Sequence, residues 1–259
     1  MEDTFYTIDF GVNYANSKKI SDDKLKKIMD ISYKSGVDKI VCISNNIQES
    51  KNNLILADKY ENLHFTLGIH PHNASQFKHE DMKFLEDNIK HKKCFGIGEC
   101  GLDFNRNFSP KEKQIEVFKK QLELAKKTNS KLYLHCRDAY SCFIEILKEY
   151  NYYNGLIHCF TGNITHALEF TRMGFKLGIT GWLLDKRRNK DLMNVIIDKR
   201  ILLEMLIVET DAPFMPIYPN KESSPENTCD IIYEIARLKN IDPVKCGKII
   251  YNNSITFLN

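Results

Sequence analysis

The stretch GIGECGLDF at residues 96–104 decides the fold. It begins as a short apolar run, as a buried β-strand does, and then places a carboxylate at Glu99. Three other segments have the same form and reach a group that binds metals: LYLHCRD at residues 132–138 reaches His135, GLIHCFTG at 155–162 reaches His158, and LIVETDAP at 206–213 reaches Asp211. A carboxylate or imidazole is costly to bury alone, so four of them at strand ends predict a shared partner.

The spacing of apolar runs predicts how these four segments are arranged. Runs typical of strands occur at residues 5–10, 39–44, 65–69, 94–99, 131–135, 156–160, 175–180 and 206–209. Between them lie stretches with helical periodicity, such as residues 109–127. Eight alternating units favour a parallel sheet closed into a (β/α)8 TIM barrel, with an open doubly wound sheet as the competitor. The barrel is favoured because polar residues follow at least five strands, as they do at a barrel rim.

Composition bounds the class of protein. With 259 residues, 42% of them apolar, the chain suits one barrel domain over residues 1–259. A formal net charge of +3 is too mild for a dedicated nucleic-acid coat, although it does not repel a polyanion. The eight cysteines are irregularly spaced, which is typical of reduced core residues.

Targeting signals are the next consideration. The start MEDTFYTIDF lacks the basic and apolar regions of a signal peptide, and no apolar run approaches the roughly 18 residues of a membrane span. We therefore expect a soluble protein of the cytoplasm, or of the nucleus, that does not enter a membrane.

Each of the four strand-end groups has a structural alternative. Glu99 could pair with a lysine or arginine, the two histidines could be satisfied core residues, and Asp211 could cap the proline-rich turn after it. Glu209 is two residues from Asp211, so spacing alone leaves open which carboxylate meets a metal. We favour metal ligation because four candidates coincide. Two carboxylates and two imidazoles suit Zn²⁺, Mn²⁺ or Mg²⁺ without choosing between them.

Further residues that could carry chemistry lie after other strands. His70 and His72 in GIHPH follow the third strand, and Pro71 between them favours a turn, so His70 is the better candidate for site contact. Arg137 directly follows the predicted ligand segment and could clamp phosphate with its forked guanidinium, or could be a helix-start charge. Asp103 could be a loop cap or a substrate contact.

Taken together, the motifs resemble the TatD family of metal-dependent deoxyribonucleases, a branch of the amidohydrolase-like barrels. The resemblance spans nearly the whole chain and rests on IDFGVN, GIHPH, GIGECGLDFNRNFS, HCRDA, HCFTG, GITGW and ETDAP in family order. It implies a (β/α)8 barrel that cleaves DNA phosphodiesters with a divalent metal, commonly as an exonuclease from the 3′ end. Single-stranded DNA or frayed ends are the substrate that this implies.

The resemblance also implies roles for individual residues. Glu99, His135, His158 and Asp211 correspond to the family's metal ligands, with Asp211 also helping to activate the attacking water, and His70 to an additional active-site histidine. Many relatives carry a His-x-His pair after strand one, where this chain has Gly11 and Asn13. We therefore expect at least one metal, with a second recruited alongside the substrate phosphate. Asp9 is an outer ligand or a hydrogen-bond acceptor in the core.

Three functions compete on the sequence. The first is a metal-dependent deoxyribonuclease in which metal-activated water attacks phosphorus, Arg137 neutralises phosphate, and aromatic residues such as Trp182, Phe104 and Phe214 stack on bases. The second is hydrolysis of a small amide, ester or lactone at the same centre. The third is a barrel that binds nucleic acid without catalysis, which the retention of all four predicted ligands argues against.

Overall fold

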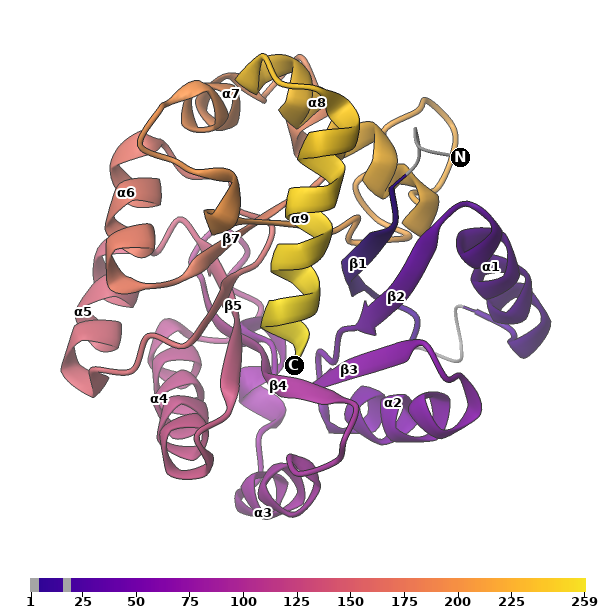
Figure 1. The fold of residues 1–259 in the computed structure, drawn as a ribbon. Helices are drawn as coiled ribbons and strands as arrows, with labels where there is room; N and C mark the ends of the chain where they lie inside the picture. Colours follow the sequence, from indigo (N-terminus) through magenta and orange to yellow (C-terminus); the bar gives the residue numbers. More distant parts are fainter. Residues whose placement is uncertain (1–4, 16–19) are drawn as a thin grey trace. The chain divides into compact units, whose positions relative to one another are not determined.

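In the part of the chain that the structure describes, eight strands follow one another in sequence order across a single sheet, β1 to β8, and helices alternate with them (Figure 1). This computed structural model describes residues 5–15 and 20–259. It confirms the predicted (β/α)8 TIM barrel and excludes the doubly wound alternative. Contacts divide the chain into a terminal unit, Met1–Cys42 with Cys159–Asn259, and a central unit, Ile43–His158. Each unit is described by itself.

Two pairs of parallel strands form the sheet of the terminal unit. β1 (Thr7–Val12) pairs with β2 (Val37–Cys42), and β7 (Lys176–Ile179) pairs with β8 (Leu206–Val208). A parallel bridge between Val12 and Ala212 joins the first pair to the chain just beyond β8. The helices of this unit are α1 (Asp22–Lys34), α6 (Ile164–Met173), α7 (Lys190–Ile197), α8 (Thr228–Lys239) and α9 (Pro243–Leu258), with short 3-10 turns η2 (Gly181–Leu184), η3 (Leu203–Met205) and η4 (Pro225–Asn227).

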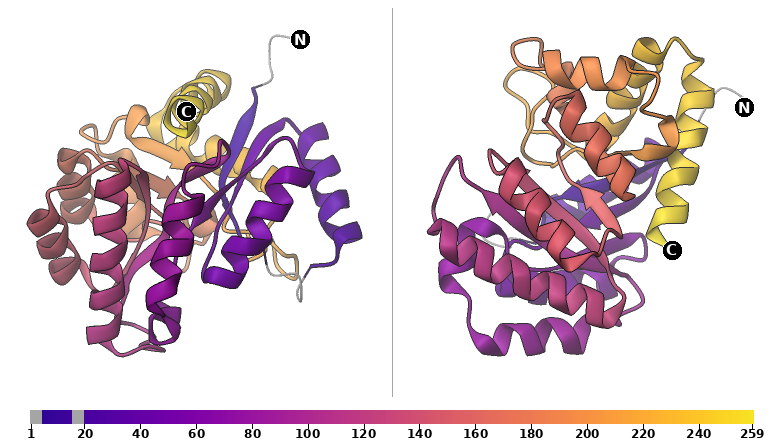
Figure 2. Two further views of the ribbon diagram at one scale, coloured as in Figure 1. Left: turned by 90° about the horizontal axis from the view of Figure 1, so that it is seen from below. Right: turned by 90° about the vertical axis from the view of Figure 1, so that its left-hand side faces the viewer.

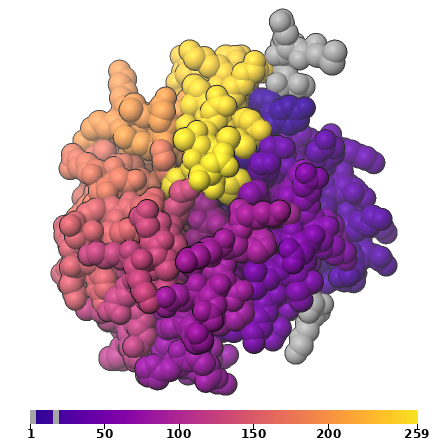
Figure 3. Space-filling model, turned by 60° about the horizontal axis from the view of Figure 1, so that its bottom comes forward, coloured from indigo at the N-terminus to yellow at the C-terminus, as the bar shows by residue number. Residues whose placement is uncertain are grey.

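The last helix closes the core of the terminal unit. α9 packs against β1, where the rings of Phe10 and Phe257 stack with centroids 5.7 Å apart. Asp242 caps its first turn by accepting a hydrogen bond from the Lys245 amide. The surface of α8 and α9 is the yellow region of Figure 3. The apolar side of α9 therefore supports the strand that leads to Asn13.

The central unit contains four consecutive parallel strands: β3 (Leu63–Leu67), β4 (Cys94–Asp103), β5 (Lys131–Arg137) and β6 (Gly155–Ile157). Its helices are α2 (Ile47–Lys59), α3 (His79–Asn88), α4 (Lys111–Thr128) and α5 (Tyr140–Tyr150), and a 3-10 turn η1 (Pro71–Gln76) follows β3. Figure 2 shows α3 and α4 side by side. The turn η1 and the loop after β4 carry the residues that matter below.

Most strand ends differ by one or more residues from the sequence prediction, and those of β4 and β8 change the setting of a predicted site residue. Glu99 was expected to close its strand, but β4 continues to Asp103, so Glu99 lies in the middle of the strand. β8 ends at Val208, so Asp211 lies in the loop beyond it rather than at the strand end. β4 runs on because β5 supplies partners as far as Arg137, which lies opposite Asp103. Gly101 is required there, since a Cβ would collide with the backbone of His135.

Two compositional expectations can be compared with the structure. No disulfide joins the eight cysteines, all of which lie among the described residues, as predicted for reduced thiols, and five of them are half-buried rather than core residues. Within residues 5–15 and 20–259, every helix is too short or too polar to cross a membrane. One domain over residues 1–259 stays a prediction.

Candidate metal centre

The carboxylate of Glu99 contacts several histidines of the central unit. Its side chain is buried, and Oε1 lies 2.8 Å from Nδ1 of His135 and 3.5 Å from Nε2 of His70. Nε2 of His158 lies 3.8 Å from the same oxygen. Three predicted site histidines from three different segments therefore meet the predicted carboxylate, as expected for groups carried by neighbouring parallel strands.

Asp103 closes the cluster on the other side of His135. Its Oδ2 lies 3.3 Å from Nε2 of His135 and 2.8 Å from Nε2 of His72. Its Oδ1 accepts hydrogen bonds from the backbone amides of Asn105 and Arg106, which hold the loop after β4 in place. Asp103 is therefore both a loop cap and a partner of two imidazoles. The sequence offered cap and substrate contact as alternatives and missed the imidazole pairing.

The turn η1 sets the positions of His70 and His72. His70 caps this turn, and its Nδ1 accepts a hydrogen bond from the backbone amide of His72. The neutral His70 ring therefore carries its proton on Nε2, the nitrogen that faces Glu99. His72 was judged the weaker candidate for site contact, but it belongs to the same cluster through Asp103. Pro71 turns the chain, and the two rings still lie with centroids 4.3 Å apart.

His158 is held by a buried tyrosine. The Tyr133 hydroxyl lies 2.6 Å from Nδ1 of His158, and the His158 backbone amide donates to the carbonyl of Leu134. Both side chains are buried. A histidine whose second nitrogen is fixed in this way presents Nε2 in a defined direction, as metal-binding histidines in proteins do.

The charges of the cluster shift its pKa values in a consistent pattern. Burial alone would raise the pKa of Glu99, but His70, His158 and His135 together hold it well below its usual range. Burial would lower the pKa of His135, and hydrogen bonds with Asp103 and Glu99 raise it instead. For His70 burial prevails and lowers the pKa to about 3. The centre thus contains ionised carboxylates, a neutral His70 and a His135 that holds its proton strongly.

In the terminal unit, Asp211 is held by Asn13. The Asn13 side-chain amide donates to Oδ1 of Asp211 at 2.7 Å, and the Asp211 backbone amide donates to the carbonyl of Gly11. Gly11 and Asn13 are therefore direct neighbours of Asp211. The Sγ of Cys159 and a carboxylate oxygen of Asp211 lie within 4.8 Å of each other.

The two other acids near Asp211 have structural roles. Glu209 is buried, and its Oε1 accepts a hydrogen bond from the backbone amide of Cys159 at 2.6 Å. Asp9 is buried as well and accepts hydrogen bonds from the backbone amides of Gly11 and Thr210 and from the Thr210 hydroxyl. Burial raises the pKa of Asp9 to about 8, against the lowering effect of these hydrogen bonds. Asp9 is thus an acceptor in the core, and Asp211 is the more exposed acid of this group.

The donor set of the central unit fits a divalent metal. His70, Glu99 and His135 each offer one ligand atom, and these atoms lie within 4.8 Å of one another. Imidazole nitrogen and carboxylate oxygen are ligands of Zn²⁺, Mn²⁺ and Mg²⁺ to different degrees. Further support for such a site is that both imidazoles of this set are oriented by a second contact, His70 by the backbone amide of His72 and His135 by Asp103.

The two predicted substrate contacts lie in different settings. Arg137 is the last residue of β5 and is half-buried. Its backbone carbonyl accepts a hydrogen bond from the backbone amide of Phe104. Trp182 lies in η2, where the Arg188 guanidinium stacks over its ring at 3.8 Å from the centroid. The indole Nε1 donates to the carbonyl of Arg188. Arg188 therefore covers one face of the ring predicted to stack on bases.

An exposed aromatic beside the centre was not singled out from the sequence. Phe108 is 68% exposed, and its ring lies edge-on to His72 with centroids 4.8 Å apart. Its neighbours along the chain include the exposed Arg106 in the loop after β4 and the exposed Lys111 at the start of α4, and Lys111 lies over the ring of Phe104. The available signal was the run NRNFSPK, an aromatic among polar and basic residues next to a predicted site strand.

Comparison with known proteins decides the family. The family model for TatD related DNase matches residues 8–259. The chain belongs to this family of TatD-related DNases. Among its TatD relatives is a protein of Pectobacterium carotovorum subsp. carotovorum (strain PC1) named 3′-5′ ssDNA/RNA exonuclease TatD. It is 34% identical over 255 residues, which cover 95% of this chain and 96% of that protein. A protein of Citrobacter koseri with the same name is 32% identical over 243 residues, covering 91% and 92% of the two chains.

Solved TatD structures share the fold. YJJV, a TatD homologue from Escherichia coli K12, aligns with a TM-score of 0.88 at 25% identity and covers 99% of this chain and 98% of its own. A TatD-family hydrolase from Entamoeba histolytica aligns with a TM-score of 0.87 at 25% identity, covering 98% of each chain. The resemblance stated from the motifs is confirmed.

Proposed function

We propose that this chain is a divalent-metal-dependent deoxyribonuclease that hydrolyses DNA phosphodiester bonds from the 3′ end of single strands or frayed ends. Membership of the TatD family and the names of its relatives, 3′-5′ ssDNA/RNA exonuclease TatD, support the activity and its direction. The observation that carries the proposal is the convergence of His70, His135 and His158 on Glu99. A buried carboxylate surrounded by three imidazoles is costly to build, and a barrel does not need it for stability.

We propose Glu99, His135, His158 and Asp211 as the metal ligands. Glu99 supplies the central carboxylate, and the two histidines are oriented by Asp103 and Tyr133. A bound divalent metal would polarise a phosphoryl oxygen and lower the pKa of water. The digestion assay below compares Zn²⁺, Mn²⁺ and Mg²⁺, and we propose that a second ion enters with the substrate phosphate.

The side chains of the protein supply the remaining chemistry. Asp211, whose Oδ1 is fixed by Asn13, accepts a proton from the water that attacks phosphorus. The bond from phosphorus to the 3′ oxygen of the preceding nucleotide breaks, and that oxygen takes up a proton from water. His70 is neutral at the working pH, so it contributes a hydrogen bond from Nε2 to the scissile phosphate rather than a positive charge.

Basic and aromatic side chains account for substrate binding. We assign Arg137 to the phosphate backbone, because its guanidinium binds phosphate in a forked geometry. Trp182 remains our candidate for base stacking, with Arg188 moving aside or the opposite ring face in use. Phe108 is an additional stacking candidate because it is exposed and lies against His72. These groups suit a polyanion with bases better than a small apolar substrate.

The test is digestion of single-stranded DNA that carries a label at one end only. Purified protein is incubated with Mg²⁺, Mn²⁺ or Zn²⁺ and strands labelled at the 5′ end, with RNA of the same sequence in parallel. Removal from the 3′ end produces a ladder of shortening labelled strands, whereas removal from the 5′ end releases the labelled nucleotide first. Glu99→Gln is expected to abolish cleavage while retaining binding of the strand.

The matched control is Glu145→Gln on α5, an acid exposed to solvent in the same unit. It should cleave at the rate of the unchanged protein. Intact substrate under all metals between pH 6 and 9, or full cleavage by Glu99→Gln, would count against the function or the metal assignment respectively.

A further inference from the structure

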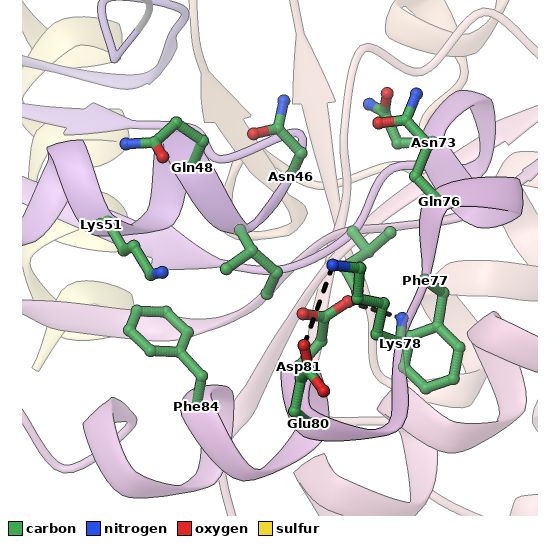
Figure 4. Close-up of a pocket in the computed structure, with 12 residues that line it drawn as sticks. Asn46, Gln48, Lys51, Asn73, Gln76, Phe77, Lys78, Glu80, Asp81 and Phe84 are labelled. Carbon is green, nitrogen blue, oxygen red and sulfur yellow. Dashed lines mark hydrogen bonds and ion pairs between the residues drawn. The ribbon is translucent and has the colours of Figure 1, made fainter.

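A cavity of about 480 Å³ lies beside the candidate centre in the central unit (Figure 4). Ile47 and Ile69 contribute its apolar surface, and Phe77 and Phe84 stand on two sides. Figure 4 shows four carboxamides along its edge: Asn46, Gln48, Asn73 and Gln76. Pockets for small ligands have this size and this mixture of apolar walls with a few polar groups.

The charges of the cavity favour a neutral group over a phosphate. Two lysines, Lys51 and Lys78, line it together with two acids, Glu80 and Asp81. Lys78 lies 3.8 Å from Glu80, and the Lys78 backbone amide donates to Asp81 at 2.7 Å. The formal charges cancel, so a phosphate would gain little attraction here. A flat, uncharged and polar-edged group is the better match.

The polar edge offers both a donor and an acceptor. The Asn46 side-chain oxygen caps α2 by accepting the Glu49 amide, so the NH₂ group of Asn46 is the part that can serve a ligand. The NH₂ group of Asn73 donates to the Asn45 carbonyl, so its oxygen can serve a ligand. A nucleobase edge presents acceptors and donors that carboxamides recognise, and aromatic rings stack on its faces.

One backbone carbonyl ties this cavity to the candidate centre. The Asn45 carbonyl accepts hydrogen bonds from the backbone amide of His70 at 3.0 Å and from the side chain of Asn73 at 2.9 Å. The Asn73 amide in turn donates to the His70 carbonyl at 2.8 Å. His70 faces Glu99 while Asn73, three residues on, lines the cavity. The turn η1 thus lies between the two sites and holds both.

We propose that this cavity is a nucleobase subsite, which receives one base of the strand whose 3′-terminal phosphodiester lies at Glu99. The proposal rests on the proposed nuclease function for the identity of the strand. The base stacks on Phe84, with Phe77 opposite, and its edge meets Asn46 and Asn73. The Lys51 ammonium lies over the Phe84 ring, 5.5 Å from its centre.

The first test uses a probe that carries no phosphate and therefore does not depend on nuclease activity. Binding of deoxyadenosine is followed by ligand-observed NMR in the presence of EDTA. We expect Phe84→Ala to weaken binding about tenfold, which corresponds to about 1.4 kcal/mol, and Phe84→Tyr to retain it. The matched control is Lys83→Ala on the same helix, whose exposed side chain pairs with Asp87 away from the cavity. Equal affinity of the unchanged protein and Phe84→Ala would overturn the subsite.

The second test places the subsite on the strand. Single-stranded DNA carrying one abasic residue at successive positions from the 3′ end is digested, and KM is measured for each. We expect one internal position where loss of the base raises KM about tenfold, and we expect Phe84→Ala to remove that position's effect without changing kcat. If the enzyme is active but KM is the same at every abasic position, the subsite proposal is overturned and the nuclease function is unaffected. If none of the strands is cleaved, the proposed nuclease function is rejected. The deoxyadenosine titration then still tests whether the cavity binds a nucleobase.

Thermal unfolding accompanies both measurements. Phe84 is half-buried on α3, so Phe84→Ala could lower the melting temperature of the protein. If it does, part of its loss of deoxyadenosine binding is due to weakened folding. Phe84→Tyr should keep both the melting temperature and the binding. Gln76→Ala, which changes an exposed residue at the opposite edge, should weaken deoxyadenosine binding with unchanged stability.

Discussion

The Asn13 side-chain amide donates a 2.7 Å hydrogen bond to Oδ1 of Asp211. Asn13 occupies a position where many relatives are expected to carry a metal-binding histidine, and here it orients an acid instead. Replacing it by alanine removes this hydrogen-bond partner of the Asp211 carboxylate. We expect Asn13→Ala to lower kcat/KM by about 10- to 100-fold, as loss of a partner that orients a ligand usually does. Steady-state digestion of labelled DNA measures this, and Asn52→Ala on α2 is the control. An unchanged rate would mean that Asn13 does not act through Asp211.

Tyr133→Phe removes the hydroxyl that contacts Nδ1 of His158. The buried imidazole then loses this hydrogen-bond partner, which costs about 1–3 kcal/mol, and its orientation toward Glu99 is less firmly fixed. We expect weaker metal binding in calorimetry by about 10- to 100-fold. Tyr152→Phe removes a hydroxyl that donates to the Ser130 carbonyl in the same unit, and it should leave metal affinity unchanged. Equal losses in the two variants would contradict the specific role of Tyr133.

Metal affinity should rise with pH. Asp103 and Glu99 hold the pKa of His135 above its ordinary value of 6.5, against the effect of burial. A metal must displace that proton, so below the raised pKa the affinity gains up to about tenfold per pH unit for each proton released. Calorimetry in two buffers of different ionisation enthalpy counts the protons. Binding without proton release at pH 6.5 would show that His135 is already neutral.

Folding stability should fall as pH rises through the range set by Asp9. Burial raises the pKa of Asp9 from 3.8 to about 8, so the folded state binds the proton more tightly than the unfolded state does. Its stabilisation is complete below the unfolded pKa and is lost as pH rises toward about 8. The slope reaches about 1.4 kcal/mol per pH unit at most.

Asp9→Asn tests this assignment by urea unfolding between pH 5 and 8. Asparagine keeps an acceptor for the amides of Gly11 and Thr210 and a donor for the Thr210 hydroxyl, so the variant should fold with a flatter pH dependence. Asp191→Asn, at an exposed position, should retain the original slope. A slope that persists in Asp9→Asn would assign the pH dependence to other groups.

Phe108→Ala should weaken substrate binding more than it slows the chemical step. The ring is exposed and touches His72, so its loss removes a stacking surface while leaving the Glu99 cluster in place. Stacking contributes about 1–3 kcal/mol per base, so KM should rise about tenfold or more with a small change in kcat. Phe108→Trp should restore the affinity. A fall in kcat alone would indicate that Phe108 acts by supporting His72.

The sequence predicted the barrel and the convergence of the histidines because both follow from strand order. Groups that follow parallel strands meet at one rim, whatever the detailed register. The position of Glu99 within β4 was missed because the run GIGECGLD contains glycines that can end a strand or continue it. It continues here because β5 supplies partners as far as Arg137.

Contacts between side chains were not predictable in the same way. Spacing could not separate Glu209 from Asp211, since both follow β8 and could share a face. The structure turns Glu209 toward the Cys159 amide, a long-range contact that leaves no trace in local pattern. The pairing of Asp103 with His72 and His135 likewise depends on how η1 folds against the loop after β4. The stacking of Arg188 on Trp182 is local in sequence, but it requires knowledge of the turn between them.

The turn η1, with His70 at its start and Asn73 on the side of the cavity, is a spacer of fixed length. If His70 and Asn73 contact the same DNA strand, the scissile bond and the bound base are always separated by the same number of nucleotides. Digestion of a long strand should then proceed evenly and slow sharply once the remainder no longer reaches the cavity. The reaction would leave a short oligonucleotide of uniform length as its limit product, and the length of that remnant would measure the spacer.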